Sequence, residues 1–119
     1  MYEDILGRRV LVTGASRGLG FHLARRFKAA GAVIAINGRD KIALSSAAEA
    51  LGADLHIAGD VSSSNEAKVV ADGVIAGFGG LDILVCNVGS GRSARPGQEV
   101  SEDWSKSIAM NLFSATNMV

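Results

Sequence analysis

The chain has 119 residues, of which 48% are hydrophobic and 20% charged, and its 12 basic residues balance its 12 acidic ones. This length and apolar content fit one globular domain, while the zero net charge gives no overall attraction to nucleic acid or to an anionic membrane surface. A lone cysteine, Cys86, excludes an internal disulfide and the acidic start does not fit a secretory signal, so we expect a cytoplasmic protein.

The first predicted strand, at residues 9–13, leads directly into a turn at residues 14–20 whose glycines have the spacing G-x-x-x-G-x-G. After the turn, Leu23 and Phe27 continue an apolar stripe at helical spacing that stops at Gly31. Glycine suits such a turn because it adopts backbone angles that a side chain forbids and lets backbone N–H groups approach a pyrophosphate at a helix N-terminus. This strand, turn and helix predict a dinucleotide site.

The second predicted strand, at residues 32–36, is followed by the segment 37–39 and by a helix whose apolar stripe ends at Gly52. Asp40 stands where this helix begins, so we expect it to be the N-terminal cap. The strand is also the most continuous apolar stretch in the N-terminal half of the chain. It is far shorter than the roughly 20 residues that span a bilayer, so we expect no membrane contact.

The two remaining strands are predicted at residues 55–58 and 81–86. A helix is predicted after each of them. The earlier one begins near residues 62–65, which offer capping side chains, and ends at Gly79, while the later one covers residues 101–115. Strand and helix therefore alternate four times along the chain.

This alternation predicts an α/β fold, a doubly wound, Rossmann-like parallel sheet of about four strands with helices on both faces. Such sheets bind ligands beyond the carboxyl ends of their strands, where the strand order reverses. Glycine or polar residues suited to a nucleotide follow every predicted strand, at residues 14–20, 37–39, 59–61 and 87–91. The agreement of four strand ends carries more weight than any single motif.

Together these motifs resemble the short-chain dehydrogenase/reductase family, and the resemblance, which covers the whole chain, implies a Rossmann cofactor-binding domain at residues 1–119. It implies that the glycine turn holds the cofactor diphosphate. Asp60 would accept a hydrogen bond from the adenine amino group, and Val61 would pack beside adenine. Asn87 and Gly89 would line the nicotinamide side, and Asn111 would belong to the catalytic tetrad and help to hold a proton-relay water.

Two positions depart from the family pattern. Cys86 stands where the family often has a further asparagine, and Val88 stands where it usually has alanine. Val88 adds bulk beside the expected nicotinamide pocket, so it affects the shape of the substrate pocket more than the place of the cofactor. The residues expected to bind the cofactor are Gly14, Ser16, Arg17, Gly18, Leu19, Gly20, Asn37, Arg39, Asp60, Val61, Asn87, Val88 and Gly89.

Charge at the end of the second strand indicates which cofactor is bound. An NAD site places Asp or Glu there, about 20 residues after the glycines, to hold the ribose hydroxyl. No acid stands at residues 36–38. Instead, Arg39 follows the strand and Arg17 lies inside the glycine turn, where both can make charge-assisted hydrogen bonds to the 2′-phosphate of NADP. We therefore expect NADP(H) rather than NAD(H).

Simpler explanations exist for each polar residue. Asp60 alone fits a turn or helix cap, and Asn111 fits a buried polar group with a backbone partner. Arg17 and Arg39 fit ordinary surface charges. The two histidines, His22 and His56, have no neighbouring cluster of metal ligands in the sequence, so we expect no metal site, and Trp104 fits a core or interface residue.

Three other functions compete with an oxidoreductase. Residues 14–18 also fit G-x-S-x-G, the nucleophile elbow of serine hydrolases, but the only later histidine is His56, inside a predicted strand. A methyltransferase is expected to carry an acid at the end of the second strand, which is lacking here. A non-catalytic nucleotide-binding or interaction module remains the alternative from a different class.

The resembled family places a serine and a Tyr-x-x-x-Lys pair after a fifth strand, and neither follows in this sequence. The only tyrosine is Tyr2, and no helix-stopping residue precedes Val119. We therefore expect an incomplete domain that keeps the nucleotide half, lacks the C-terminal catalytic half and does not catalyse the reaction alone. The intact enzyme would act on a small-molecule carbonyl or alcohol. The last helix is part of a subunit interface in the resembled family, so a homo-oligomer is expected.

Overall fold

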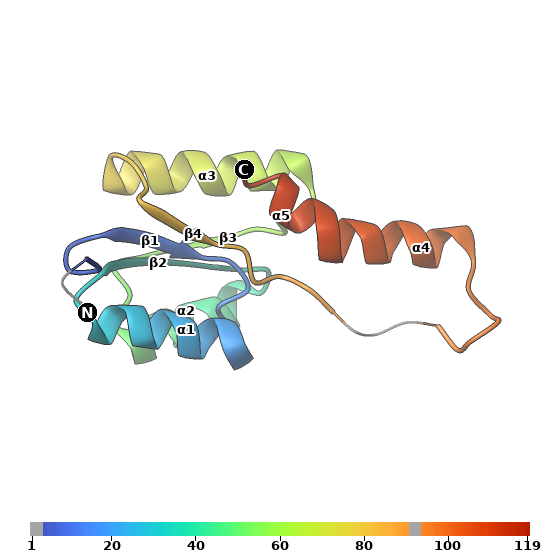
Figure 1. Cartoon of the computed structure of the whole chain (residues 1–119), viewed down its shortest axis with the longest axis horizontal. Helices are drawn as coiled ribbons and strands as arrows, with labels where there is room; N and C mark the ends of the chain where they lie inside the picture. The colour runs from blue at the N-terminus through green and yellow to red at the C-terminus, as the bar shows by residue number, and fades with distance from the viewer. Residues whose placement is uncertain (1–3, 91–93) are drawn as a thin grey trace.

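Figure 1 shows the computed structural model of the chain, which describes residues 4–90 and 94–119. Its centre is a parallel sheet of four strands in the order β3-β2-β1-β4. The bounds are Arg9–Val12 for β1, Val33–Gly38 for β2, Leu55–Ala58 for β3 and Ile83–Val85 for β4. The predicted doubly wound α/β fold is confirmed. The central pair is in register with Val10 opposite Ile34.

Helices cover both faces of the sheet, as Figure 1 shows. On one face lie α1 (Gly18–Ala29) and α2 (Lys41–Leu51), and on the other lie α3 (Ser64–Phe78) and the short α5 (Ser114–Thr116). The helix α4 (Ser101–Ile108) extends away from the sheet, beyond the carboxyl ends of the strands. Among the described residues, no helix is long and apolar enough to cross a bilayer.

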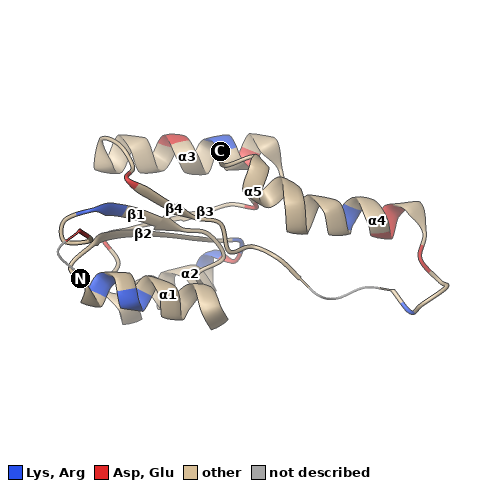
Figure 2. Cartoon of the chain, in the orientation of Figure 1, with Lys and Arg blue, Asp and Glu red and all other residues tan. Residues whose placement is uncertain are grey.

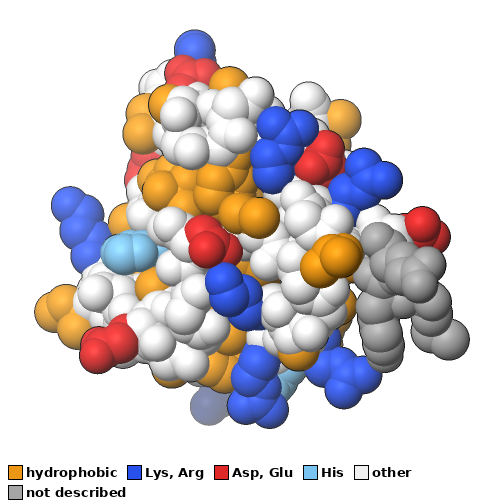
Figure 3. Space-filling view, turned by 90° about the vertical axis from the view of Figure 1, so that its left-hand side faces the viewer, with side chains coloured by type: hydrophobic (Ala, Val, Ile, Leu, Met, Phe, Trp, Pro, Cys, Tyr) orange, Lys and Arg blue, Asp and Glu red, His pale blue; other side chains and the backbone are white. Residues whose placement is uncertain are grey.

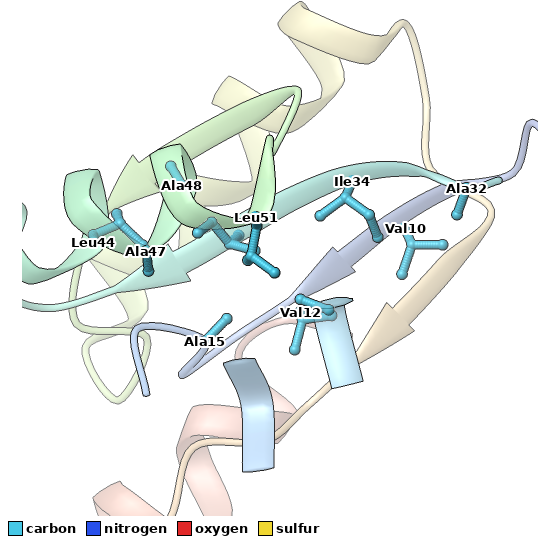
Figure 4. Close-up of a cluster of buried hydrophobic side chains, with 11 residues drawn as sticks. Val10, Val12, Ala15, Ala32, Ile34, Leu44, Ala47, Ala48 and Leu51 are labelled. Atoms are coloured by element: carbon cyan, nitrogen blue, oxygen red, sulfur yellow. The ribbon is translucent and has the colours of Figure 1, made fainter. Parts of the chain in front are cut away.

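Two apolar layers hold the sheet to its helices, because neighbouring strand residues point to opposite faces. Val10 and Val12 of β1 face α1 and α2, where they pack with Ile34 and Leu44 (Figure 4). Leu11 points the other way and packs with Val70 of α3. Strands that are buried on both faces are apolar throughout, which is why the sequence shows continuous apolar runs rather than alternation.

Helix ends follow the predicted signals. The Asp40 carboxylate accepts hydrogen bonds from the backbone N–H groups of Ile42 and Ala43, at 2.9 and 3.1 Å, so the predicted cap of α2 is confirmed. Gly52 and Gly79 end α2 and α3 in the left-handed conformation, with φ of 66° and 75°. Glycine is favoured at both positions because a side chain there is strained.

Several element boundaries differ from the prediction. β1 ends at Val12 rather than at residue 13, and β4 covers Ile83–Val85 rather than residues 81–86. The second strand continues through Asn37 and Gly38, because their Cα atoms pair with Ile57 and Ala58 of β3 and extend the backbone ladder past the apolar run. The last helix was predicted as one element, but α4 ends at Ile108 and a π-helical turn, η1 (Ala109–Phe113), separates it from α5. Side-chain periodicity cannot distinguish a wide turn inside a helix from a regular one.

Charged side chains are spread over the molecule. Figure 2 shows basic and acidic residues on both helix layers. The end of the molecule away from α4, seen in Figure 3, carries charges of both signs around a group of hydrophobic side chains. This mixed distribution agrees with the equal numbers of basic and acidic residues in the sequence.

Candidate functional site

A groove of about 620 Å³ lies at the carboxyl ends of the strands. Segments that follow all four strands line it, together with Met110 from η1. The described residues thus bring together, in one place, segments that are far apart in the sequence. Of the residues predicted to bind the cofactor, those that line the groove are Gly14, Ser16, Arg17, Gly18, Leu19, Asn37, Arg39, Asp60, Val61, Asn87, Val88 and Gly89.

The three motif glycines are needed for two different structural reasons. Gly14 and Gly18 have positive φ, 61° and 62°, which strains any side chain. A Cβ at Gly18 would meet no atom within 4 Å, so its backbone faces open space at the start of α1. Gly20, which does not line the groove, is buried, and a Cβ there would clash with the carbonyl oxygen of Gly14. The first turn of α1 therefore packs directly on the turn that precedes it.

The fourth strand holds the glycine turn in place. The Asn87 side chain donates from Nδ2 to the Gly14 carbonyl oxygen at 3.1 Å, and the Asn87 backbone N–H donates to Thr13 Oγ1 at 3.1 Å. Thr13 is buried, and its hydroxyl donates to the Val85 carbonyl oxygen. Asn87 thus lines the groove, and its side-chain amide is hydrogen-bonded to the glycine turn. No separate role for Thr13 follows from the sequence, because the residue lies inside the strand predicted at residues 9–13.

Two side-chain oxygens at the end of β2 are buried without a hydrogen-bond partner among the described residues. They are Ser16 Oγ and Asn37 Oδ1, and both residues line the groove. The Asn37 Nδ2 group is used within the fold, since it donates to the carbonyl oxygens of Ile57 and Gly59 at 3.0 and 3.1 Å. Buried polar atoms are normally hydrogen-bonded, so these two oxygens are exceptions in the wall of the groove.

The same part of the groove carries no acid on β2. A Cβ at Gly38 would lie closer than 3.0 Å to Ser16 Oγ. Asp40, the nearest acid along the chain, caps α2 with its carboxylate. Arg17 and Arg39 line this part of the groove, are exposed and make no ion pair with any residue in the described ranges. Positive charge is therefore available where a negative ligand group is expected.

At the end of β3, Asp60 has both a structural contact and a place in the groove. Its Oδ1 accepts hydrogen bonds from the backbone N–H of Ser62 at 3.0 Å and from the Ser62 hydroxyl at 2.6 Å. The Asp60 backbone N–H donates to Glu66 Oε1 at 3.1 Å. Oδ2 makes no hydrogen bond within residues 4–90 and 94–119 and remains as an acceptor. Asp60 can therefore stabilise the turn through Oδ1 and still accept a hydrogen bond from a ligand through Oδ2.

Asn111 lies outside the groove, in η1. Its Oδ1 accepts a hydrogen bond from the Ser90 backbone N–H at 2.8 Å, and its Nδ2 donates to the carbonyl and hydroxyl oxygens of Ser107 at 3.0 and 3.3 Å. It lines a second hollow of about 610 Å³ between α4 and the chain that follows β4. Met110 lines both spaces, so Asn111 is next to the groove that holds the other predicted residues.

The groove also contains residues that the sequence reasoning did not assign to a ligand, namely Gly38, Asp40, Ala43, Gly59 and Met110. Gly38 and Gly59 were recognisable as residues that follow strands. Nothing in the sequence signals Met110, because the wide turn of η1 brings it to the groove from 50 residues beyond Asp60.

Among the described residues there is no metal cluster, and Ser16, the serine of the G-x-S-x-G pattern, has no base beside it. No group of three His, Cys, Asp or Glu side chains among them can hold a metal ion. His22 lies on α1 against Phe21, with ring centroids 5.7 Å apart, and His56 lies on β3. The Ser16 hydroxyl has no hydrogen-bond partner in the described ranges, so this structure gives the G-x-S-x-G alternative no activating base.

Comparison with known proteins adds to this geometry. A family profile described as short chain dehydrogenase matches residues 8–119. Glucose 1-dehydrogenase of Gluconobacter oxydans is 39% identical over 118 residues, which cover 93% of this chain and 44% of that protein.

Two solved structures have the same fold. L-sorbose reductase from Gluconobacter frateurii, complexed with NADPH and L-sorbose, matches with a TM-score of 0.92 at 30% identity, over 99% of this chain and 47% of that one. The 3-ketoacyl-(acyl-carrier-protein) reductase from Brucella melitensis, complexed with NADH, matches with a TM-score of 0.89 at 28% identity, over 96% and 48%. The chain therefore spans less than half the length of the proteins it matches.

Proposed function

Because the chain belongs to the short-chain dehydrogenase family, we propose that residues 1–119 are the NADP(H)-binding part of an oxidoreductase. The observation that carries this proposal is that Arg17 and Arg39 both line the groove and make no ion pair with any other residue that the structure describes. Two guanidinium groups there favour a phosphate ester, and the absence of an acid on β2 disfavours a free ribose 2′-hydroxyl.

The remaining residues of the groove have roles that fit the same cofactor. The turn at Gly14 and Gly18 offers backbone N–H groups and the N-terminus of α1 to a diphosphate. Asp60 Oδ2 is an acceptor for an amino group, and Val61 lines the groove beside it, where adenine is proposed to lie. Val88 and Gly89, beyond the end of β4, fit the nicotinamide side.

The choice between NADP(H) and NAD(H) is tested by titrating the 119-residue chain with NADPH and NADH in parallel. The relatives do not decide it, since the matched structures include one complexed with NADPH and one complexed with NADH. We expect NADPH to bind at least about tenfold more tightly, which is the effect of one additional charge-assisted contact. Tighter binding of NADH would contradict the cofactor assignment, and failure to bind either would contradict the whole proposal.

In the proposed reaction of the intact enzyme, a hydride moves between the nicotinamide and the carbon of a small-molecule carbonyl or alcohol. Asn111 is proposed to help in proton transfer, since its side chain is fixed between Ser90 and Ser107 next to the groove.

The only tyrosine in the sequence is Tyr2, and it is not followed by lysine four residues later. A phenol with a pKa near 10 needs a nearby cation to exchange its proton at neutral pH. Residues 1–119 are therefore expected to bind cofactor without turnover.

We also propose that the chain self-associates through α4 and lies in the cytoplasm. The exposed side chains of Trp104, Ile108 and Leu112 give α4 and η1 an apolar surface that water disfavours. In support of a reducing compartment, the sequence contains a single cysteine.

A further inference from the structure

The short helix α5 and the turn that ends it contact two of the loops that line the groove, those after β3 and β4. The Ser114 hydroxyl donates to the Met110 carbonyl oxygen at 2.6 Å and lies 3.3 Å from the Val88 carbonyl oxygen, in the loop after β4. Three residues later, Asn117 Nδ2 donates to the carbonyl oxygens of Val61 and Ser62, at 3.1 and 3.2 Å, in the loop after β3. Residues more than 50 positions away along the chain thus fix the loop that carries Asp60.

Within that loop, other hydrogen bonds hold the residues before Val61. The Gly59 N–H donates to the Gly38 carbonyl oxygen at 3.0 Å, and the Gly59 carbonyl oxygen accepts from Asn37 Nδ2 at 3.1 Å, so the start of the loop is joined to β2. Asp60 accepts from Ser62, and Glu66 accepts from the Asp60 backbone N–H. These contacts set the shape of the turn at Asp60 and join it to the first turn of α3, to which Glu66 belongs. Among the hydrogen bonds of the described residues, those of Asn117 are the ones that hold Val61 and Ser62 to another element of the fold.

We propose that Asn117 is a positioning residue for nucleotide binding, which holds the Val61–Ser62 backbone so that Asp60 and Val61 keep their places in the groove. The inference rests on the proposed function, because it assigns the groove to a dinucleotide. A loop that is already fixed loses less conformational entropy when a ligand binds, so removing its anchor weakens binding. Since Asn117 contacts the β3 loop and Ser114 contacts the β4 loop, Asn117 acts on the adenosine half of the cofactor.

The test separates the two halves of the cofactor. The 119-residue chain and its variants are titrated with 2′,5′-ADP, which carries the adenosine half, and with reduced nicotinamide mononucleotide, which carries the other. Asn117→Ala removes both hydrogen bonds and is expected to weaken 2′,5′-ADP binding about fivefold to tenfold while nicotinamide mononucleotide binding changes less than about twofold. Asn117→Asp keeps the size of the side chain but places a carboxylate against two carbonyl oxygens, so at least the same loss is expected.

Two further variants complete the test. Asn117→Gln keeps the amide and is expected to recover part of the 2′,5′-ADP affinity. Thr116→Ala changes an exposed neighbour whose hydroxyl bonds only to the Phe113 carbonyl oxygen, and it should leave both affinities unchanged. Circular dichroism establishes that each variant is folded. If Asn117→Ala does not fold, the Gln and Asp variants are compared instead. The Gln side chain can donate a hydrogen bond and the Asp carboxylate cannot, so Asn117→Asp is expected to lose more affinity for 2′,5′-ADP than Asn117→Gln.

The outcomes are distinguishable. Unchanged 2′,5′-ADP affinity in folded Asn117→Ala and Asn117→Asp overturns the inference, as does an equal loss for both ligands. Absence of 2′,5′-ADP binding by the unchanged chain overturns the proposed function itself, and the inference with it. A loss of affinity for 2′,5′-ADP alone supports the positioning role. A general loosening of the fold would instead lower the affinity for both ligands.

Discussion

Single residues in this chain owe their identity to local backbone geometry. Gly14 and Gly18 adopt a conformation that side chains disfavour, whereas Gly20 has an ordinary helical backbone and is required because the Gly14 carbonyl oxygen occupies the place of its Cβ. The same spacing motif therefore combines two physical constraints. Substitution at each glycine should have a different effect on stability.

Replacing Gly20 with alanine is expected to destabilise the fold by about 2 kcal/mol or more, because backbone must move to admit the methyl group. The free energy of unfolding is measured by urea titration. Gly77→Ala is the matched control, since its Cβ would meet only the flexible end of the Leu55 side chain, and a helical glycine replaced by alanine gains up to about 1 kcal/mol of helix propensity. Equal stability of Gly20→Ala and the unchanged chain would contradict this packing argument.

Replacing Arg39 with alanine is expected to lower the affinity for NADPH about tenfold to a hundredfold and to leave the affinity for NADH nearly unchanged. A charge-assisted hydrogen bond contributes about 1.5–3 kcal/mol, and only NADPH carries the 2′-phosphate that it would hold. The control is Arg25→Ala, which removes an exposed arginine of α1 that does not line the groove. An equal loss for both cofactors would indicate that Arg39 holds the diphosphate instead.

Elements at the end of the sheet away from the groove are joined by an ion pair. Arg9 of β1 contacts the Asp82 carboxylate at 3.1 Å, its backbone N–H donates to Asp82 at 2.8 Å, and its guanidinium also reaches the Phe78 carbonyl oxygen. These contacts connect the start of the central strand β1 to the start of β4. Hydrogen bonds from Arg9 lower the pKa of Asp82 from 3.8 to about 2.

A lowered carboxyl pKa gives a defined dependence of stability on pH. The contribution of Asp82 is complete above its unfolded pKa near 4 and is lost as the pH falls towards about 2, because protonation ends the ion pair. The free energy of unfolding should therefore fall between pH 4 and pH 2, and Asp82→Asn should show a shallower fall over this range. Asp72→Asn is the control, since Asp72 pairs with Lys68 on the exposed surface of α3. Identical pH profiles of Asp82→Asn and the unchanged chain would contradict the assignment.

The last helical segment shows which features of a helix can be predicted from hydrophobic spacing. Apolar residues at helical spacing correctly predicted a helix from Ser101, and α4 begins there. The π-helical turn that follows is not encoded by hydrophobic spacing, yet it places Met110 at the groove and Asn111 against Ser90. The contacts of Ser114 and Asn117 depend on the same change of direction.

At the scale of the whole molecule, the strand order β3-β2-β1-β4 explains the groove. The chain crosses from β3 at one edge to β4 at the other, so the order reverses next to β1, where Gly14 and Asn87 meet. The same arrangement leaves α4 extended from the body, with Trp104, Ile108 and Leu112 exposed by 62%, 43% and 52%. These fractions are high for large apolar side chains and underlie the proposed self-association.

Replacing Ile108 with glutamate is expected to weaken self-association, raising the dissociation constant at least about tenfold, because it places a charge in the proposed apolar contact. Sedimentation velocity over a range of protein concentrations measures the effect. Ile42→Glu is the control, since Ile42 on α2 is 82% exposed but lies on a different helix. A chain that sediments as a monomer at every concentration would contradict the proposal.

The four strands and the regular helices could be predicted from the sequence alone, because buried parallel strands, glycine turns and helix caps depend on residues that are neighbours along the chain. The sequence also determined the strand ends that carry the candidate ligand residues, and those ends do line one groove. Only the tertiary structure decided that Asn37 uses its amide within the sheet, that Ser16 fills the space beside Gly38, and that Asn117 holds the loop of Asp60. Each of these contacts joins residues that are far apart along the chain and that the order of the strands brings together. That order cannot be predicted from patterns among neighbouring residues.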